Sequence, residues 1–164
     1  MAQKSFIGLL PNLCRQTLVQ KVVRVNHAAE YVTCDIYAGQ ILASKGSTEC
    51  SVFEQFQKQK KENLRKMERF CAKHEVTPSL LVPLYHCVAY SLGFITGRLG
   101  TSTAMGLSAV LEEVAAQNHN EQIKDLIEDD PETDTALLQV KSVKISQYSY
   151  LVKNIFPSYV LHDY

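Results

Sequence analysis

The chain has 164 residues, of which 46% are hydrophobic and 21% are charged. This length and composition fit one domain with a buried core and exclude a disordered protein. The 17 Lys and Arg residues balance the 17 Asp and Glu residues, so nucleic acid is not an expected partner. The five cysteines lack a C-x-x-C spacing, which argues against a zinc knuckle or a disulfide scaffold and favours a reducing compartment.

The first 29 residues contain four basic side chains and no acidic one. Such an acid-poor start is compatible with a cleaved organelle presequence, although it overlaps the first expected helix. We expect residues 1–17 to form an N-terminal extension, residues 18–155 the folded domain and residues 156–164 a tail. No uninterrupted apolar run reaches the roughly 18 residues typical of a transmembrane helix.

The first expected helix covers residues 16–44 and ends at Lys45-Gly46-Ser47, a glycine-type stop signal. Two adjacent stripes at helical spacing make more than half of its surface apolar or weakly polar, which predicts packing on several sides. The stripes are Leu18, Val22, Val25, Ala29, Val32 and Ile36, and Val23, His27, Glu30, Cys34, Tyr37 and Ile41.

Four further helices are expected, at residues 50–74, 79–98, 102–128 and 132–153. The inward stripe of the second is Phe53, Phe56, Lys60, Asn63 or Leu64, Met67 and Phe70. Strand patterns are missing, and the connections are short. The sequence therefore predicts an all-α antiparallel bundle of about five helices in which sequential helices are neighbours.

Three polar positions fall in the middle of core-facing stripes: Glu30, the pair Lys60 and Asn63, and Glu112. Carboxylates at this depth are typical of ferritin-like di-iron proteins, which take one Glu from each of two helices and a Glu-x-x-His from each of two others. None of the five histidines has a glutamate three residues before it. Two lone carboxylates do not hold two irons.

Several segments nevertheless match one such family. Residues 24–30, RVNHAAE, and residues 36–40, IYAGQ, are followed by Pro78, Pro83-Leu84, Leu111-Glu112-Glu113 and Glu128-Asp129-Asp130-Pro131. This pattern resembles the demethoxyubiquinone hydroxylases of ubiquinone biosynthesis, which are ferritin-like di-iron monooxygenases. The resemblance runs from about residue 18 to residue 139.

The resemblance places metal ligands at Glu30 and Glu112. Its two Glu-x-x-His motifs fall on Lys60 and Asn63, and on Tyr148 and Leu151, none of which is a ligand of that kind. The family uses iron, and we expect no metal in this chain.

Two carboxylates close together in a poorly solvated interior need a cation. We therefore predict an ion cluster of Glu30, Lys60 and Glu112, with Asn63 hydrogen-bonded beside it. The alternative is that Lys60 extends to solvent and Glu30 bonds His27.

Three functions follow from the resemblance. The first is a ubiquinone biosynthesis protein with a degenerate metal site that binds a prenylated quinone or subunits of the biosynthetic complex. The apolar segment 79–98 would then contact a membrane interface. The second is an active hydroxylase with a rebuilt metal site, and the third is a diverged copy without function. The resemblance implies a mitochondrial location, peripheral to the inner membrane.

Overall fold

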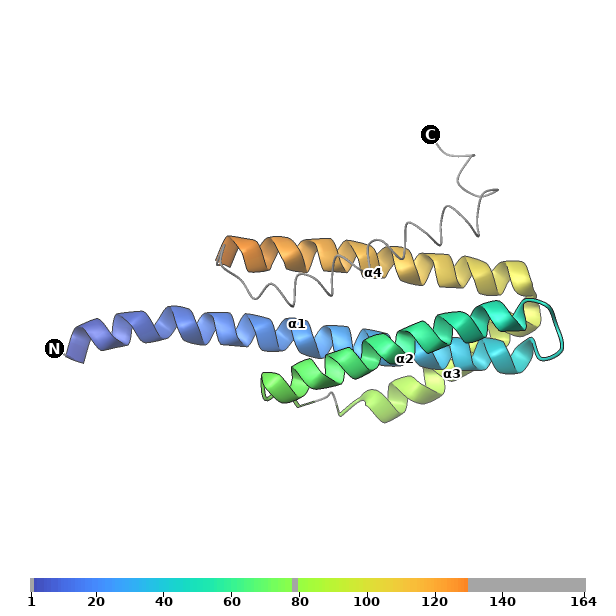
Figure 1. Ribbon diagram of the computed structural model, residues 1–164, viewed down its shortest axis with the longest axis horizontal. Coiled ribbons are helices and arrows are strands. Elements are labelled where there is room, and N and C mark those ends of the chain that lie inside the picture. The colour runs from blue at the N-terminus through green and yellow to red at the C-terminus, as the bar shows by residue number, and fades with distance from the viewer. Residues whose placement is uncertain (1, 78–79, 130–164) are drawn as a thin grey trace, which may run out of the picture. The chain divides into compact units, whose positions relative to one another are not determined.

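The computed structural model describes the backbone of residues 2–77 and 80–129 and the side chains of residues 16–77, 80–122 and 124–125. The described residues form four helices and no strand (Figure 1). These are α1 (Ala2–Ala43), α2 (Cys50–Lys73), α3 (Val82–Leu99) and α4 (Thr101–Asp129). The all-α helical bundle predicted from the sequence is confirmed.

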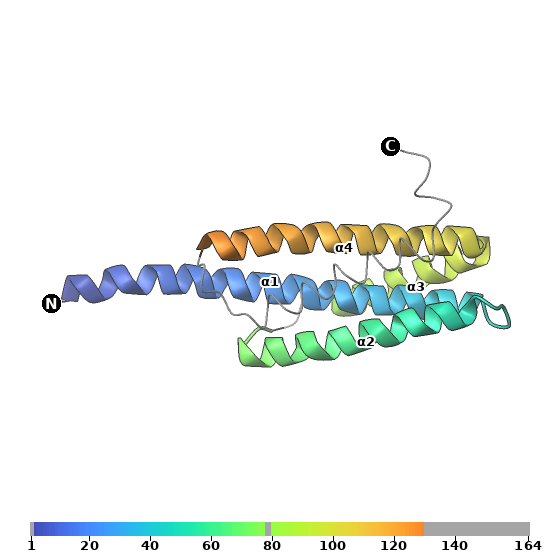
Figure 2. The same ribbon diagram turned by 45° about the horizontal axis from the view of Figure 1, so that its top comes forward.

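The chain divides into two compact units, Met1–Ala104 and Met105–Tyr164. In the first unit, both α2 and α3 pack against α1 (Figures 1 and 2). α2 runs antiparallel to α1, as the short connection predicts. α3 runs parallel to α1, because contacts between them advance in the same direction, from Asp35 with His86 to Ala43 with Gly97. The prediction that sequential helices are antiparallel neighbours therefore holds for α1 with α2, whereas α3 packs on α1.

The hairpin of α1 and α2 closes where the sequence predicted a stop. The amide of Ser44 donates to the carbonyl of Gln40 over 2.9 Å, and Gly46 takes a φ of +86°, which only glycine adopts without strain. Tyr37 and Phe56, both buried, bring their ring centroids to 5.6 Å across the two helices. This aromatic pair fixes the register on which the site depends.

Glycines allow α1 and α3 to approach closely. A Cβ atom on Gly93 would lie 2.0 Å from the carbonyl oxygen of Ile36, and one on Gly39 would lie 2.2 Å from the carbonyl oxygen of Tyr90. Backbone therefore packs directly on backbone at this crossing. α3 buries only small side chains there (Ala89, Gly93 and Thr96), so its larger apolar residues remain outside the contact.

One expectation about the helices needs correction. α1 begins at Ala2, so the predicted start near residue 16 was wrong: the apolar segment before it continues the helix through Pro11. The predicted fifth helix, residues 132–153, lies outside the described residues, as does the predicted tail at 156–164. The domain limits at residues 17 and 155 stay predictions. In the part of the chain that is described, no helix is long and apolar enough to cross a lipid bilayer.

Candidate functional site

α1 brings a polar group into the middle of its contact with α2. Glu30 is 4% exposed and His27 is 7% exposed. Both lie on the stripe that continues through Cys34 and Tyr37, at the spacing of three and four residues that keeps side chains on one helix face. The stripe predicted from the sequence is therefore confirmed as buried at these four positions.

α2 places polar side chains at the same depth of its contact with α1. Its buried residues follow one another at intervals of three and four residues: Phe53, Phe56, Lys60, Asn63, Met67 and Cys71. Asn63, rather than Leu64, takes the inward position, and Cys71 replaces the predicted Phe70. Lys60 is 6% exposed, which favours an inward side chain over one that extends to solvent. A polar pair thus interrupts an apolar stripe midway along α2.

The register of the hairpin places these polar groups close together. Contacts join Gln20 with His74, Cys34 with Gln57, and Tyr37 with Phe56. In an antiparallel helix pair, the residue numbers of facing positions add to a nearly constant value. This rule puts Glu30 opposite Asn63 and puts Lys60 opposite Cys34.

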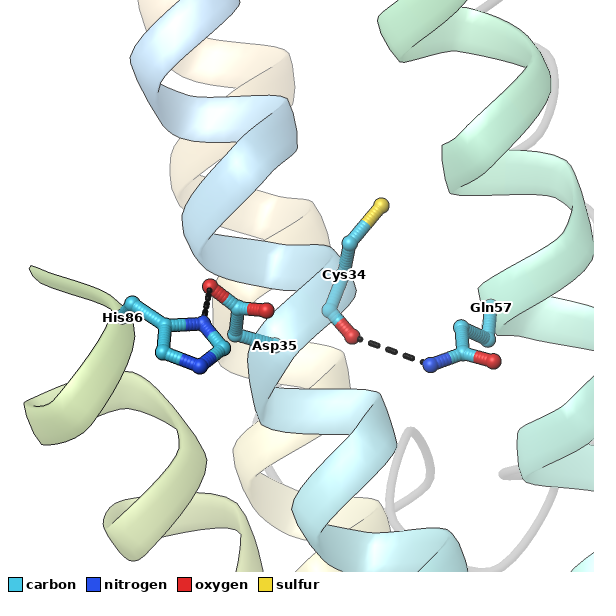
Figure 3. Close-up of polar contacts among 4 residues, drawn as sticks. All are labelled: Cys34, Asp35, Gln57 and His86. Carbon is cyan, nitrogen blue, oxygen red and sulfur yellow. Dashed lines mark hydrogen bonds and ion pairs between the residues drawn. The ribbon is translucent and has the colours of Figure 1, made fainter. Parts of the chain in front are cut away.

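The pKa of the Cys34 thiol depends on the charges around it. Burial, Glu30 and Asp35 raise its pKa from 9.0 to about 12, and Lys60 and Lys61 oppose the rise. Figure 3 shows the Cys34 side chain on α1 and its carbonyl oxygen accepting a 3.3 Å hydrogen bond from Nε2 of Gln57 on α2. Glu30 and Lys60 therefore both act on one buried sulfur atom, from two different helices.

Two buried nitrogen atoms next to these charges have no hydrogen-bonding partner within the described residues: Nδ1 of His27 and Nδ2 of Asn63. Buried polar atoms normally find a partner in protein or in ordered water. The α1–α2 interior at this depth is thus polar and incompletely satisfied by the described side chains.

Glu112 lies on α4 in the second unit, at helical spacing from Ser108. Its predicted proximity to Glu30 and Lys60 stays a prediction. Tyr148 and Leu151 lie outside the described residues. The register places Glu30 and Lys60 near the level of Cys34 on two packed helices, and the ion cluster itself stays a prediction.

Sequence reasoning missed an ion pair between α1 and α3. Nδ1 of His86 lies 2.9 Å from Oδ2 of Asp35 (Figure 3), and the rings of Tyr31 and Tyr90 lie 6.5 Å and 6.3 Å from the His86 ring. His86 and Asp35 are 51 positions apart in sequence, so no local pattern could have found the pair. In Figure 3, Asp35 and Cys34 turn to opposite sides of α1, one toward α3 and one toward α2.

A second missed residue is Gln40. Its side chain is fully buried, and its Nε2 donates a 3.0 Å hydrogen bond to the carbonyl of Ala104 in the first turn of α4. The signal for this residue was present in the IYAGQ segment, where a glutamine follows an apolar helix face. Its role is to fix the start of α4 on α1.

Comparison with known proteins identifies the family. The sequence profile of the family described as "Ubiquinone biosynthesis protein COQ7" matches residues 17–148. This chain belongs to that family. The family membership and the resemblance to demethoxyubiquinone hydroxylases predicted from the sequence are thereby confirmed.

Curated relatives agree with the profile. The chain is 40% identical over 126 residues to the "NADPH-dependent 3-demethoxyubiquinone 3-hydroxylase, mitochondrial" of Caenorhabditis elegans, which covers 77% of this chain and 67% of that protein. It is 35% identical over 131 residues to the Homo sapiens protein of the same name, covering 80% of this chain and 60% of the relative. The "3-demethoxyubiquinol 3-hydroxylase" of Rhodospirillum rubrum is 28% identical over 114 residues, or 69% of this chain and 54% of the relative. The chain thus spans between half and two thirds of the length of these relatives.

The donor atoms of the described residues do not fit a di-iron centre. Among residues 2–77 and 80–129, no three His, Cys, Asp or Glu side chains are grouped so that they could hold a metal ion. Lys60 and Asn63 occupy the α2 positions at which the resemblance expects a glutamate and a histidine, and a charged ammonium group has no lone pair for a metal. Both side chains point inward, where the ligands of such a site would lie.

Proposed function

We propose that this protein acts in mitochondrial ubiquinone biosynthesis by binding a prenylated quinone, or subunits of the biosynthetic complex, without performing the di-iron hydroxylation. The observation that carries this proposal is the burial of Lys60 and Asn63 at the α2 ligand positions of the family. The family match and the mitochondrial relatives support the pathway and the compartment. A peripheral position at the inner membrane is part of the same proposal.

The outer surface of α3 is evidence for binding of an apolar ligand. Large apolar side chains recur there at intervals of three and four residues and are between 38% and 70% exposed: Leu84, Tyr85, Val88, Leu92, Ile95 and Leu99. An apolar helix face of this kind is typical of contact with a membrane interface or an isoprenoid chain. Because α3 packs on α1 through small side chains, its large ones are left for such a contact.

The proposal is tested by metal analysis and turnover of the purified 164-residue chain, with the Caenorhabditis elegans hydroxylase as a positive control. We expect the chain to contain far less than one iron atom per molecule and to form no hydroxylated product from demethoxyubiquinone and NADPH. Two irons per chain, together with product formation, would instead support the alternative of an active hydroxylase with a rebuilt metal site.

Quinone bound to the purified protein is measured by mass spectrometry in the same samples, because retention separates a binding function from a diverged copy without one. We expect retention by the wild type and by Cys87→Glu, and at least tenfold lower retention by Val88→Glu. The two variants add the same charge to exposed positions of α3, but Val88 lies at the centre of the apolar stripe, whereas Cys87 lies about 100° away from it around the helix. Absence of quinone from the wild type would contradict the binding function.

A further inference from the structure

The contact of α1 with α2 contains a buried charge of each sign. Glu30 and Lys60 are exposed by only 4% and 6%. A carboxylate or an ammonium group removed from water without a compensating charge is strongly destabilised. Each buried group therefore needs a compensating charge nearby.

The two charges share one neighbourhood. Both perturb the Cys34 thiol, and with opposite signs. The antiparallel register independently puts Lys60 at the level of Cys34, which lies one helical turn after Glu30 on the same face of α1. A lysine side chain is long enough to cover one helical turn of about 5.4 Å.

The neighbouring basic side chains of Lys61 and Arg24 form hydrogen bonds with other groups. Lys61 is exposed and its Nζ donates to Oε1 of Gln57 over 3.0 Å. Nε of Arg24 donates to the carbonyl of Thr77 over 3.3 Å, at the far end of α2. Among the side chains that the structure describes, Lys60 is the one buried lysine or arginine.

We propose that the ammonium group of Lys60 supplies, as part of the chain, the positive charge that metal ions supply in the hydroxylases of this family. Lys60 then serves as the counter-charge of the buried Glu30, and the hairpin of α1 and α2 folds without metal. This inference rests on the premise of the proposed function that the site holds no iron, but it does not depend on quinone binding.

A double-mutant cycle on the full chain tests the pairing. Lys60→Met and Glu30→Gln each remove one charge with little change in shape, and each leaves the opposite buried charge without this partner. We expect each single variant to lower the folding equilibrium constant by roughly a hundredfold or more. The double variant should recover at least tenfold of the combined loss, because it removes both charges of the pair. Urea unfolding followed by circular dichroism gives the equilibrium constants.

Lys58→Met is the matched control, because Lys58 lies two positions away on the exposed face of α2 and should change the constant less than threefold. If Lys60→Met does not fold, recovery of folding in the double variant still supports the pair. Additive effects of the two single variants would overturn the proposal, as would equal effects of Lys60→Met and Lys58→Met.

Metal independence is measured with the same unfolding assay. We expect dialysis against a strong chelator to leave the unfolding midpoint of the wild type unchanged. A lower midpoint after chelation, restored by iron or zinc, would overturn the role of Lys60. If the protein binds no quinone but the effects of Lys60→Met and Glu30→Gln are still non-additive, only the proposed function is contradicted.

Discussion

At the scale of single residues, Cys34 connects the buried charges to a measurable pH dependence. Its thiol is held neutral by burial and by the carboxylates of Glu30 and Asp35, which raise the pKa from 9.0 to about 12. The folded chain therefore keeps this proton between pH 9 and 12, whereas the unfolded chain releases it. Stability that is fully present below pH 9 is lost as the pH rises through this window.

Cys34→Ser removes the ionisable thiol, so comparing this variant with the wild type isolates the pH dependence that Cys34 contributes to stability. Between pH 9 and 10.5, the free energy of unfolding of the wild type should fall more steeply than that of the variant, by up to about 1.4 kcal/mol per pH unit. Urea unfolding at a series of pH values measures both slopes, and the other titrating groups cancel in the difference. Parallel profiles of the two proteins would contradict the raised pKa.

At the scale of secondary-structure elements, the crossing of α1 and α3 depends on the absence of a side chain at Gly93. A Cβ atom there would lie 2.0 Å from a carbonyl oxygen of α1, and the backbone cannot yield as the end of a flexible side chain can. The crossing positions the Asp35–His86 ion pair as well. Because His86 is half exposed, that pair stabilises the contact only weakly.

Gly93→Ala should destabilise the chain by about 1–3 kcal/mol, as expected for overpacking of a close contact. Gly106→Ala is the control, because a Cβ atom there meets nothing within 4 Å. That variant should be neutral or stabilise the chain by up to about 1 kcal/mol, since alanine favours a helix interior over glycine. Thermal unfolding of the two variants beside the wild type measures the difference. Equal midpoints for both alanine variants would mean that the crossing tolerates a side chain.

At the scale of the whole molecule, one of the two missing Glu-x-x-His motifs falls within the described residues, on α2, and can be rebuilt there. Lys60→Glu combined with Asn63→His rebuilds one Glu-x-x-His on the inward face of α2, opposite Glu30. Two carboxylates and an imidazole can then share one divalent ion. Without the Lys60 ammonium group, the carboxylates repel each other unless a cation binds between them.

We therefore expect the double replacement to make folding depend on metal. Added zinc should raise the unfolding midpoint of the variant by several degrees and leave that of the wild type unchanged. Differential scanning calorimetry measures both, and Glu30→Gln in the variant background should reduce the gain. If zinc does not change the unfolding midpoint of the variant, α1 and α2 do not pack in the geometry inferred from their register.

The inward stripe of α2 and the α1 stripe that includes His27, Glu30, Cys34 and Tyr37 largely followed from the sequence, because the helical period of 3.6 residues marks the buried face. In the other predicted α1 stripe, Val25 and Ala29 are exposed. The period also predicted that Lys60 turns inward from a polar run. It could not choose between Leu64 and Asn63, since adjacent residues differ by only about 100° around the helix. The parallel packing of α3 on α1 was missed because it depends on glycine contacts between distant segments.

By itself, the sequence determined that the chain is helical, that it belongs to a family of ubiquinone biosynthesis proteins, and that both Glu-x-x-His motifs are missing. These are local or comparative properties, carried by spacing along the chain. Only the tertiary structure decided that Lys60 is buried rather than solvated, and that its charge and that of Glu30 act on the same thiol. Burial and the proximity of distant charges arise when helices pack, and no spacing within one helix encodes them.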